Sequence, residues 1–203
     1  MGRYTGPKTR ISRRYGVQIF GPSKSLERKN YPPGMHGPKG SRRKQSEYAI
    51  ALGEKQKLRY QYGLLERQFR RIFQHALRKR GVTGETLLQL LETRLDNVIY
   101  RLGLATSRPQ ARQLVRHGHF LVNGKKVDVP SYSVRVSDVI GVRESSRNTP
   151  SIQHAIEEVK GRGIPEWLSF DANGLTGKVS SLPTREQINL PVQEQLIVEL
   201  YSK

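Results

Sequence analysis

Residues 107–119 read Ser107-Arg108-Pro109-Gln110-Ala111-Arg112-Gln113-Leu114-Val115-Arg116-His117-Gly118-His119 and carry the clearest folding signal in the chain. Ser107 suits the N-cap of a helix, and Gln110, three residues later, completes a capping box with it. Pro109 falls in the first turn, where its missing N–H costs little. Gly118 can end the helix in a left-handed conformation. The stretch therefore predicts a short helix with defined ends.

Two stripes run along this helix. Ala111, Leu114 and Val115 follow the i, i+3, i+4 pattern, so they share a face that can pack on a neighbour. An adjacent face carries three arginines spaced four residues apart, Arg108, Arg112 and Arg116. Like charges this close repel one another unless an anion lies between them. The arginine stripe therefore indicates a polyanionic partner.

A hairpin follows the helix directly. Its sequence is Phe120-Leu121-Val122-Asn123-Gly124-Lys125-Lys126-Val127. Asn123-Gly124 is the preferred type I′ pair, because both residues tolerate positive φ. A nucleotide-binding phosphate loop is excluded, since the glycine opens a hairpin rather than a helix and Lys126 replaces the Ser or Thr. A basic helix joined to a basic hairpin is typical of a unit that reads nucleic acid.

The charge of the chain supports this interpretation. Its 203 residues hold 36 Lys and Arg against 17 Asp and Glu, a net charge of +19, and 35% are hydrophobic. Such a charge implies a polyanionic partner or severe self-repulsion, and the apolar content suffices for one or two small cores. Residues 1–50 hold 12 basic and 2 acidic residues, whereas residues 151–203 hold 5 and 7. We expect the polyanion to contact the first three-quarters of the chain and the last quarter to face solvent or a basic protein.

Several classes of protein and site are excluded. The absence of cysteine removes disulfides, cysteine–zinc sites and thiol catalysis. The sequence contains no apolar run of about 18 residues, so no membrane span is predicted. The N-terminus lacks the apolar core of a secretory signal. His117-x-His119 has no carboxylate close in sequence, so packing or phosphate hydrogen bonds are favoured over a metal. We expect no metal and no cofactor.

The N-terminal half is predicted to be helical after a basic arm. Residues 1–45 are rich in Arg, Lys, Gly and Pro, which predicts an extended arm that orders on its partner, with a solubilising tail as the alternative. Residues 46–60, with Ser46 as cap, and residues 64–79 have helical apolar spacing. The apolar stripe of residues 83–102 predicts one helix, or two broken near Thr93.

The C-terminal half mixes strands and helices. Short strands are predicted at residues 130–132, 133–136 and 139–142, and a helix after Thr149-Pro150. Residues 195–201 alternate weakly, which suggests a final strand.

Two single residues also have predicted roles. Asp96, between Arg94 and Arg101, predicts an ion pair that orients arginine rather than a general base. Trp167 is predicted to be a core residue or a strand cover.

Particular segments of the chain resemble a known family. Arg94-Leu95-Asp96-Asn97-Val98, the stretch 107–119, residues 122–127 and Pro130-Ser131-Tyr132 resemble the RNA-binding module named after ribosomal small-subunit protein S-four. Beyond that module, four further segments resemble the bacterial ribosomal S-four family, so that the resemblance covers nearly the whole chain. These segments are Met1-Gly2-Arg3-Tyr4-Thr5-Gly6-Pro7, Tyr31-Pro32-Pro33-Gly34-Met35-His36-Gly37, Glu54-Lys55-Gln56-Lys57-Leu58-Arg59 and Leu190-Pro191-Val192.

The resemblance implies a function. Members of the family are non-enzymatic constituents of the small ribosomal subunit in the cytoplasm. They bind the five-prime domain of 16S ribosomal RNA at a multi-helix junction and nucleate assembly of the 30S body. They contact ribosomal proteins S-five and S-three and influence translational accuracy, and many repress their own operon through its messenger RNA.

The expected fold class is α+β, with a mainly helical subdomain, an extended basic N-terminal arm and an inserted small αβ RNA-binding module of the αL type. The expected domains are the arm at 1–45, the first part of the helical subdomain at 46–93, the S-four-type module at 94–154, and residues 155–203, which complete the helical subdomain.

The candidate RNA-binding residues combine basic side chains of the arm, the helices and the module with two polar ones of the helix–hairpin unit. They are Arg3, Arg10, Arg13, Arg14, Arg43, Lys44, Lys55, Lys57, Arg59, Arg70, Arg108, Arg112, Arg116, His119, Asn123 and Lys125.

Two positions depart from the family's pattern. Some members hold zinc with cysteines in the arm, where this chain has Thr9 and Ser12, so its arm must be ordered by RNA and packing. Ser137 precedes Asp138 where a glycine is common, which can alter one turn without abolishing binding.

Two other classes of protein fit a basic chain. An RNA-modifying enzyme such as a pseudouridine synthase can carry the same module, but the remaining arm and helices leave too little chain for a catalytic domain. A DNA-architectural protein is the second. Arginine stripes and lysine turns instead suit the phosphates of folded RNA, which is read by shape.

Overall fold

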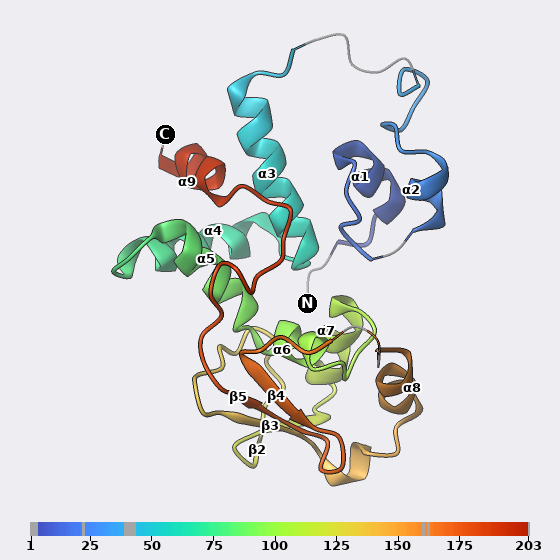
Figure 1. Ribbon diagram of the computed structural model, residues 1–203, viewed down its shortest axis with the longest axis vertical. Helices are drawn as coiled ribbons and strands as arrows, with labels where there is room; N and C mark the ends of the chain where they lie inside the picture. Colours follow the sequence, from blue (N-terminus) through green and yellow to red (C-terminus); the bar gives the residue numbers. More distant parts are fainter. Residues whose placement is uncertain (1–3, 22, 39–43, 160, 162, 203) are drawn as a thin grey trace. The chain divides into compact units, whose positions relative to one another are not determined.

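The fold consists of two compact units (Figure 1). It is described from a computed structural model, in which residues 4–21, 23–38, 44–159, 161 and 163–202 are placed. The helical unit comprises Met1–Gly84 and Leu190–Lys203, and the α+β unit comprises Glu85–Asn189. The α+β class is confirmed. The module expected at 94–154 lies inside the α+β unit, and the C-terminal residues 155–203 divide between the two units.

The helical unit is built around α3 (Glu47–Gln61) and α4 (Glu66–Arg78). Ser46 caps α3 as expected, because its hydroxyl accepts a hydrogen bond from the N–H of Ala49 at 3.3 Å. The last helix, α9 (Glu194–Ser202), packs along α3 (Figure 1). The expected final strand at 195–201 is therefore wrong. Helical spacing instead buries Ile197 and brings Tyr201 against the ring of Phe73, with centroids 4.6 Å apart.

The arm contains regular structure, α1 (Lys8–Tyr15) and α2 (Lys24–Arg28), where an extended segment was expected. Apolar side chains explain this difference, since Ile11 and Leu26 are buried. Arg13 also stabilises the arm, because its guanidinium donates to the carbonyls of Lys29, Tyr31 and Pro32 at 3.1–3.4 Å. The described part of the arm is thus held by packing and hydrogen bonds within the chain.

The stripe of residues 83–102 forms two helices, α5 (Thr83–Glu92) and α6 (Leu95–Arg101). Arg94, with ψ 137°, has an extended conformation between them. The break is stabilised by backbone hydrogen bonds from Leu95 N–H to Tyr132 O at 2.8 Å and from Val134 N–H to Thr93 O at 2.9 Å. Because these partners lie far along the chain, the spacing of apolar residues could not decide between one helix and two.

The α+β unit contains an antiparallel sheet in the order β2-β1-β3-β5-β4. Its strands are β1 (Phe120–Val122), β2 (Lys125–Lys126), β3 (Val139–Val142), β4 (Leu168–Asp171) and β5 (Thr176–Val179). The expected hairpin is confirmed, with φ of 50° at Asn123 and 77° at Gly124. The strands expected at 130–132 and 133–136 are wrong, because this segment forms turns and a single bridge between Ser133 and Arg94.

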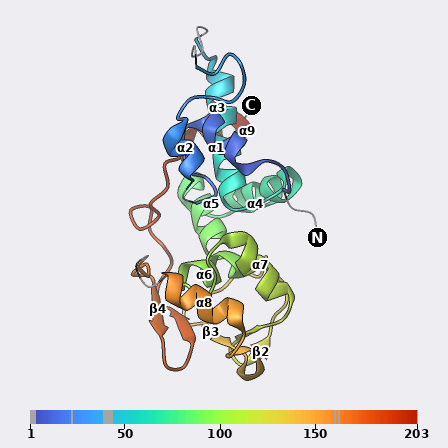
Figure 2. The same cartoon turned by 90° about the vertical axis from the view of Figure 1, so that its right-hand side faces the viewer.

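Three helices cover one face of the sheet (Figure 2), namely α6, α7 (Arg108–Arg116) and α8 (Pro150–Val159). A short 3₁₀ turn, η1 (Glu144–Ser146), precedes α8. The helix expected after Thr149-Pro150 is confirmed. Phe120, Ile140 and Trp167 lie in the core beneath these helices, so the expectation that Trp167 is a core residue is also confirmed.

Ser137 occupies a position with φ 72°, in the left-handed region. Glycine adopts this region without strain, whereas serine does so at some cost. The adjacent Asp138 stabilises the turn, since its carboxylate accepts from the N–H of Arg135 and from Asn123 Nδ2, both at 2.8 Å. Ser137 therefore leaves the turn intact, at the cost of a strained backbone conformation.

Candidate nucleic-acid-binding surface

Helix α7 begins and ends close to the expected residues, but its capping differs. Ser107 has the extended conformation of an N-cap, yet its side chain makes no capping hydrogen bond, so the expected capping box is wrong. Gln110 Oε1 instead accepts from the N–H of Thr106 at 2.8 Å and from its hydroxyl at 2.7 Å. Gly118 has φ 75° beyond the helix, as expected.

The outer arginines of α7 have partners within the chain. Arg108 donates from Nε to Asn97 Oδ1 at 2.8 Å, and its guanidinium lies 4.5 Å from the centroid of the Tyr100 ring. Arg116 pairs with Asp128 at 3.2 Å, and both side chains are at least half exposed. Such an exposed ion pair contributes little to stability, so Arg116 remains available to a stronger anion.

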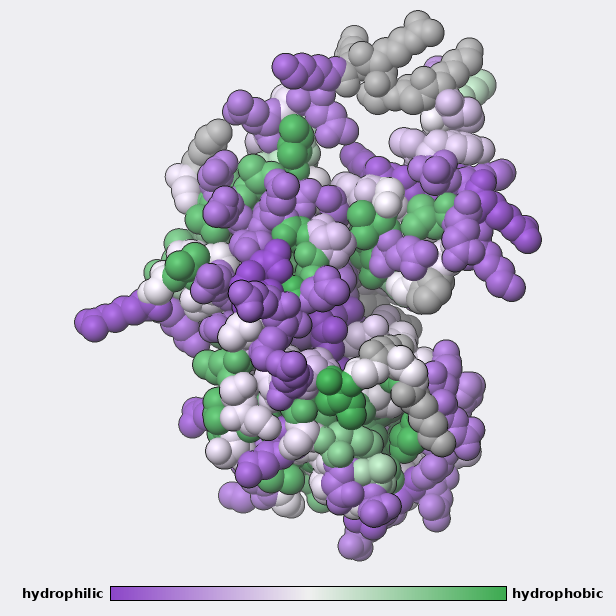
Figure 3. Space-filling view, in the orientation of Figure 1, coloured by the Kyte–Doolittle hydropathy of each residue, from purple (hydrophilic) through white to green (hydrophobic). Residues whose placement is uncertain are grey.

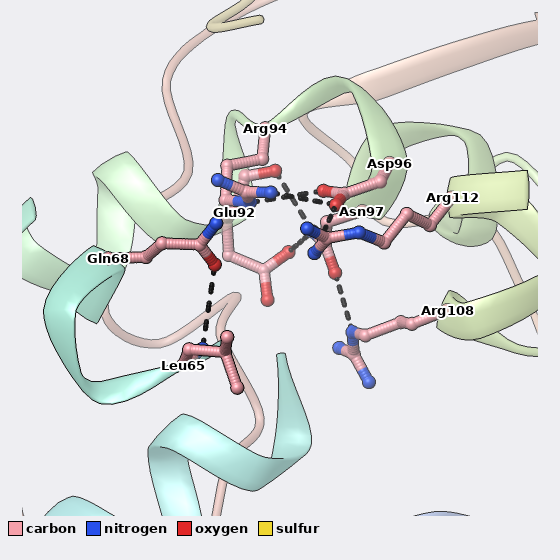
Figure 4. A network of polar contacts seen from close by, with 8 residues as sticks. All are labelled: Leu65, Gln68, Glu92, Arg94, Asp96, Asn97, Arg108 and Arg112. Carbon is pink, nitrogen blue, oxygen red and sulfur yellow. Dashed lines mark hydrogen bonds and ion pairs between the residues drawn. The ribbon is translucent and has the colours of Figure 1, made fainter. Parts of the chain in front are cut away.

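Arg112 differs from its two neighbours because it lies in the interior (Figure 4). Its Nη1 lies 3.7 Å from Asp96 Oδ2, and Arg94 binds the same carboxylate with two hydrogen bonds of 3.1 and 2.8 Å. Burial lowers the pKa of Arg112, against the opposing effect of the Asp96 charge. In the described part of the chain, its Nε and Nη1 atoms are buried without a hydrogen-bond partner. Arg112, the middle arginine of the stripe, is thus buried in the protein and does not face solvent.

A second buried carboxylate lies beside this cluster. Glu92 is fully buried and accepts from Asn97 Nδ2 at 2.7 Å (Figure 4). It also accepts from the guanidinium of Arg101 at 2.7 and 3.0 Å. The expected ion pair of Asp96 is confirmed with Arg94, whereas Arg101 pairs with Glu92. These contacts fix the break between α5 and α6 and orient α7.

The hairpin presents cations to solvent. Lys125 and Lys126 are exposed on β2, at the edge of the sheet. The Asn123 side chain is held locally, by Asp138 and by the N–H of Val139 at 2.9 Å. His119, at the start of the hairpin, has its Nδ1 2.9 Å from the hydroxyl of Ser146.

His119 should make the stability of the α+β unit depend on pH. Burial, followed by His117 and Arg143, lowers the pKa of His119 below its ordinary value of 6.5. The unfolded chain therefore binds more protons in this pH range, and stability decreases as the pH falls through 6.5 towards the folded-state pKa. We expect His119→Gln to lose less stability than the parent between pH 7.5 and 5.5 in urea unfolding followed by Trp167 fluorescence. His154→Gln, at an exposed position, is the control, and an equal loss in parent and His119→Gln would contradict this role.

Three candidate residues of α3 take part in contacts inside the helical unit. Lys55 is buried and pairs with Glu66 at 2.9 Å, and the Tyr201 hydroxyl donates to the same carboxylate at 2.8 Å. Burial alone would raise the pKa of Glu66, but the hydrogen bonds from Lys55 and Tyr201 lower it. Arg59 lies 3.8 Å from Glu66. These contacts connect α9 to α3 and α4.

Lys57 has a similar role. It pairs with Glu54, whose second oxygen accepts from the N–H of Gln193 at 3.2 Å. This contact holds the segment that leads into α9.

The remaining candidates of the helical unit are mostly exposed. Arg10, Arg14, Lys44 and Arg70 are exposed, whereas Arg13 is half-buried against three carbonyls. In Figure 3 hydrophilic side chains crowd over α1 and α2. Arg3 and Arg43 lie outside the described residues.

Further exposed cations lie on α4 and were not among the predicted RNA-binding residues. Arg67 and Arg71 lie near Arg70 on α4 and are also exposed. Their position on the polar side of an amphipathic helix was visible in the sequence.

The described residues contain neither a candidate metal site nor a candidate membrane-spanning helix. No group of three or more His, Asp or Glu side chains in those residues could hold a metal ion. No helix within the same ranges is long and apolar enough to cross a membrane.

Comparisons with known proteins cover the whole chain. The family model described as "Ribosomal protein S4/S9 N-terminal domain" matches residues 3–92, and the one described as "S4 domain" matches residues 93–140. Three relatives with the name "Small ribosomal subunit protein uS4" match along their full length and that of this chain. They come from Opitutus terrae (58% identical over 203 residues), Thermus thermophilus (55% over 210) and Akkermansia muciniphila (51% over 203). With an S4 domain in the α+β unit and full-length identity above half, the chain belongs to the family of small ribosomal subunit protein uS4, whose members are ribosomal proteins and not enzymes.

Proposed function

We propose that this protein is a primary 16S ribosomal RNA-binding protein, which binds the five-prime domain at a helix junction and nucleates assembly of the 30S body. The observation that carries the proposal is the set of exposed cations on α1, α4 and the hairpin of a chain with net charge +19. Folded RNA offers phosphates on several helices, and its helices are recognised by shape and backbone rather than by sequence.

The environment of each of the sixteen candidates suggests whether it contacts RNA directly or positions other parts of the protein. We propose that Arg10, Arg14, Arg70 and Lys125 contact phosphate directly, because their side chains are exposed and basic. We propose the same for Lys44 and, outside the described residues, for Arg3 and Arg43.

The other candidates have partners inside the chain, and five of them are proposed to act mainly by positioning. Arg13, Lys55, Lys57, Arg59 and Arg112 hold the arm, α9 and α7 in place. Arg108, Arg116, His119 and Asn123 lie at the surface of the helix–hairpin unit, where RNA can exchange with their present partners.

The salt dependence of RNA binding tests the direct contacts. For Lys125→Gln we expect weaker binding and a salt dependence that is flatter by about one unit in the slope of log K against log[salt], because one phosphate contact is lost. Binding to a transcript of the 16S five-prime domain is measured by filter retention at several salt concentrations.

Lys178→Gln is the matched control. Lys178 is exposed on β5, three strands from β2 in the same sheet, and should leave the slope unchanged. An unchanged slope for folded Lys125→Gln would remove the hairpin contact from the proposal. Competition with excess duplex DNA separates RNA recognition from architectural DNA binding, since binding of the transcript should survive it.

We further propose contacts with ribosomal proteins S-five and S-three, an influence on translational accuracy, and repression of the protein's own operon through its messenger RNA. Residues 151–203 hold 5 basic and 7 acidic residues, a composition that suits a basic protein partner better than RNA. Exposed carboxylates there include Glu157, Glu158 and Glu186. Replacing the three with Gln should weaken binding of purified S-five at low salt and leave RNA binding unchanged.

A further inference from the structure

A cavity in the helical unit lies beside the exposed arginines of α1. It has a volume of about 570 Å³, within the range of about 300–1,000 Å³ that is usual for ligand pockets. Its walls come from the arm and from α3. They consist of Tyr4, Pro7, Arg10, Ile11, Arg14, Pro32, Pro33 and Tyr60.

The apolar part of the wall includes two aromatic rings. The Tyr4 and Tyr60 rings meet edge to face, with centroids 5.1 Å apart and an interplanar angle of 71°. Phe20 supports both, at 6.3 Å from Tyr4 and 6.2 Å from Tyr60. The guanidinium of Arg59 lies 4.4 Å from the centroid of Tyr60. Such surfaces suit a flat, polarisable ligand.

The proline wall is fixed by the fold of the arm. Arg13 donates to the carbonyls of Tyr31 and Pro32, and its guanidinium lies 4.9 Å from the centroid of the Tyr31 ring. Gly37 lies so close to the Pro32 carbonyl oxygen that a Cβ atom would collide with it, and its N–H donates to the Gly34 carbonyl at 3.1 Å. The cavity is therefore preformed rather than created by a ligand, which lowers the entropic cost of binding.

The charged part of the wall is cationic. Arg10 and Arg14 lie one turn apart on α1, both exposed, and neither α1 nor the cavity wall contains an acidic residue. Two guanidinium groups at this spacing repel each other unless an anion lies between them. The aromatic rings favour a flat group and the two arginines favour an anion. A nucleotide combines both, with its base at one end and its phosphate at the other.

We propose that this cavity receives one unpaired nucleotide of the bound RNA, with its base against Tyr4 or Tyr60 and its phosphate between Arg10 and Arg14. The inference rests on the proposed RNA-binding function and identifies a contact that reads an extruded base. Proteins that recognise unpaired RNA bases stack them on aromatic rings and on arginine planes. An RNA source is favoured over a free nucleotide because the surrounding arm presents many exposed cations, far more than one phosphate group needs.

The first test is the affinity of the full chain for the transcript of the 16S five-prime domain. Tyr60→Leu should weaken binding by about five- to a hundred-fold, the usual effect of losing one base–aromatic stack. Tyr60→Phe keeps the ring and should bind within about twofold of the parent. Tyr48→Leu makes the same change at an exposed position on α3 outside the cavity and is the matched control. Circular dichroism establishes that each variant is folded.

The second test uses the unmodified protein and does not depend on folding of a variant. Ultraviolet irradiation of the complex, followed by digestion and mass spectrometry, should find a nucleotide adduct on the peptide that contains Tyr4 or the one that contains Tyr60. A titration of the free protein with adenosine monophosphate, followed by tyrosine fluorescence, shows whether a free nucleotide occupies the cavity without RNA.

The outcomes separate the two proposals. If the parent does not bind the transcript, the proposed function fails and the inference fails with it. If the parent binds but Tyr60→Leu binds equally well and adducts lie elsewhere, only the cavity inference is overturned. The cavity inference would also be overturned if adenosine monophosphate saturates the free protein while Tyr60→Leu binds RNA as tightly as the parent. That result would favour a free nucleotide as the ligand of the cavity. Weak binding by Tyr60→Leu, rescue by Tyr60→Phe and an adduct in the cavity would establish it.

Discussion

Asp96→Ala should destabilise the α+β unit by about 3–5 kcal/mol, because it removes the partner of two buried arginines. Arg94 would lose both of its hydrogen bonds to the carboxylate, and Arg112 would lose the negative charge that offsets its burial. Among the described residues, Nε and Nη1 of Arg112 already have no hydrogen-bond partner, so loss of the Asp96 charge would leave the guanidinium more poorly compensated. Loss of this anchor should also disturb α7 and the RNA contacts that depend on it.

Urea unfolding followed by the fluorescence of Trp167 measures this effect. Trp167 is the single tryptophan of the chain and is buried in the core of the α+β unit. Asp128→Ala is the matched control, because it also removes an aspartate partner of an α7 arginine, but from a pair whose side chains are 60% and 50% exposed. The control should cost at most about 1 kcal/mol. Equal costs for the two variants would show that the buried cluster contributes nothing beyond a surface pair.

Phe73→Ala should destabilise the helical unit by about 3–5 kcal/mol, the usual cost of removing a buried phenylalanine. Phe73 is 2% exposed and stacks on Tyr201, so its loss leaves a cavity between α4 and α9 and removes an aromatic contact. The Tyr201 hydroxyl, which donates to Glu66, would then lose the surface that positions it. We expect α9 to separate from the unit before the other helices.

Hydrogen exchange with mass spectrometry can locate this effect, since it reports opening segment by segment. Exchange in Phe73→Ala should rise most in α4 and α9. Leu77→Ala, on the same helix but 51% exposed, should change exchange little. A uniform increase over the whole chain in Phe73→Ala, without excess in α9, would contradict the proposed anchoring of the C-terminal helix.

Much of the fold was predictable because its signals are local. The type I′ hairpin follows from the conformations that Asn123 and Gly124 tolerate, and α3 from Ser46 and the spacing of apolar residues. The strand predicted for residues 195–201 is wrong, because a short apolar run fits a strand or a helix until its neighbours are known. Here α3 and the ring of Phe73 favour the helix.

For the candidate RNA-binding residues, the sequence did not predict which side chains are buried or paired. Arg112 and Arg116 lie on one stripe of one helix, yet the first faces Asp96 in the interior and the second faces solvent. Lys55, in a basic segment, has its charge neutralised by Glu66, which in turn is held by Tyr201, 135 residues further along the chain. The spacing of residues in the sequence indicates neither the burial of Arg112 nor the ion pair between Lys55 and Glu66.

The sequence by itself determined the basic character of the chain, its hairpin, most of its helices and its family, because charge, turn chemistry and helical periodicity are set by residues a few positions apart. Only the tertiary structure decided which cations are free to meet an anion, and it also formed the ring-lined cavity beside Arg10 and Arg14. The reason is physical. The availability of a charge depends on burial and on the nearest opposite charge, and both are fixed by contacts between distant segments.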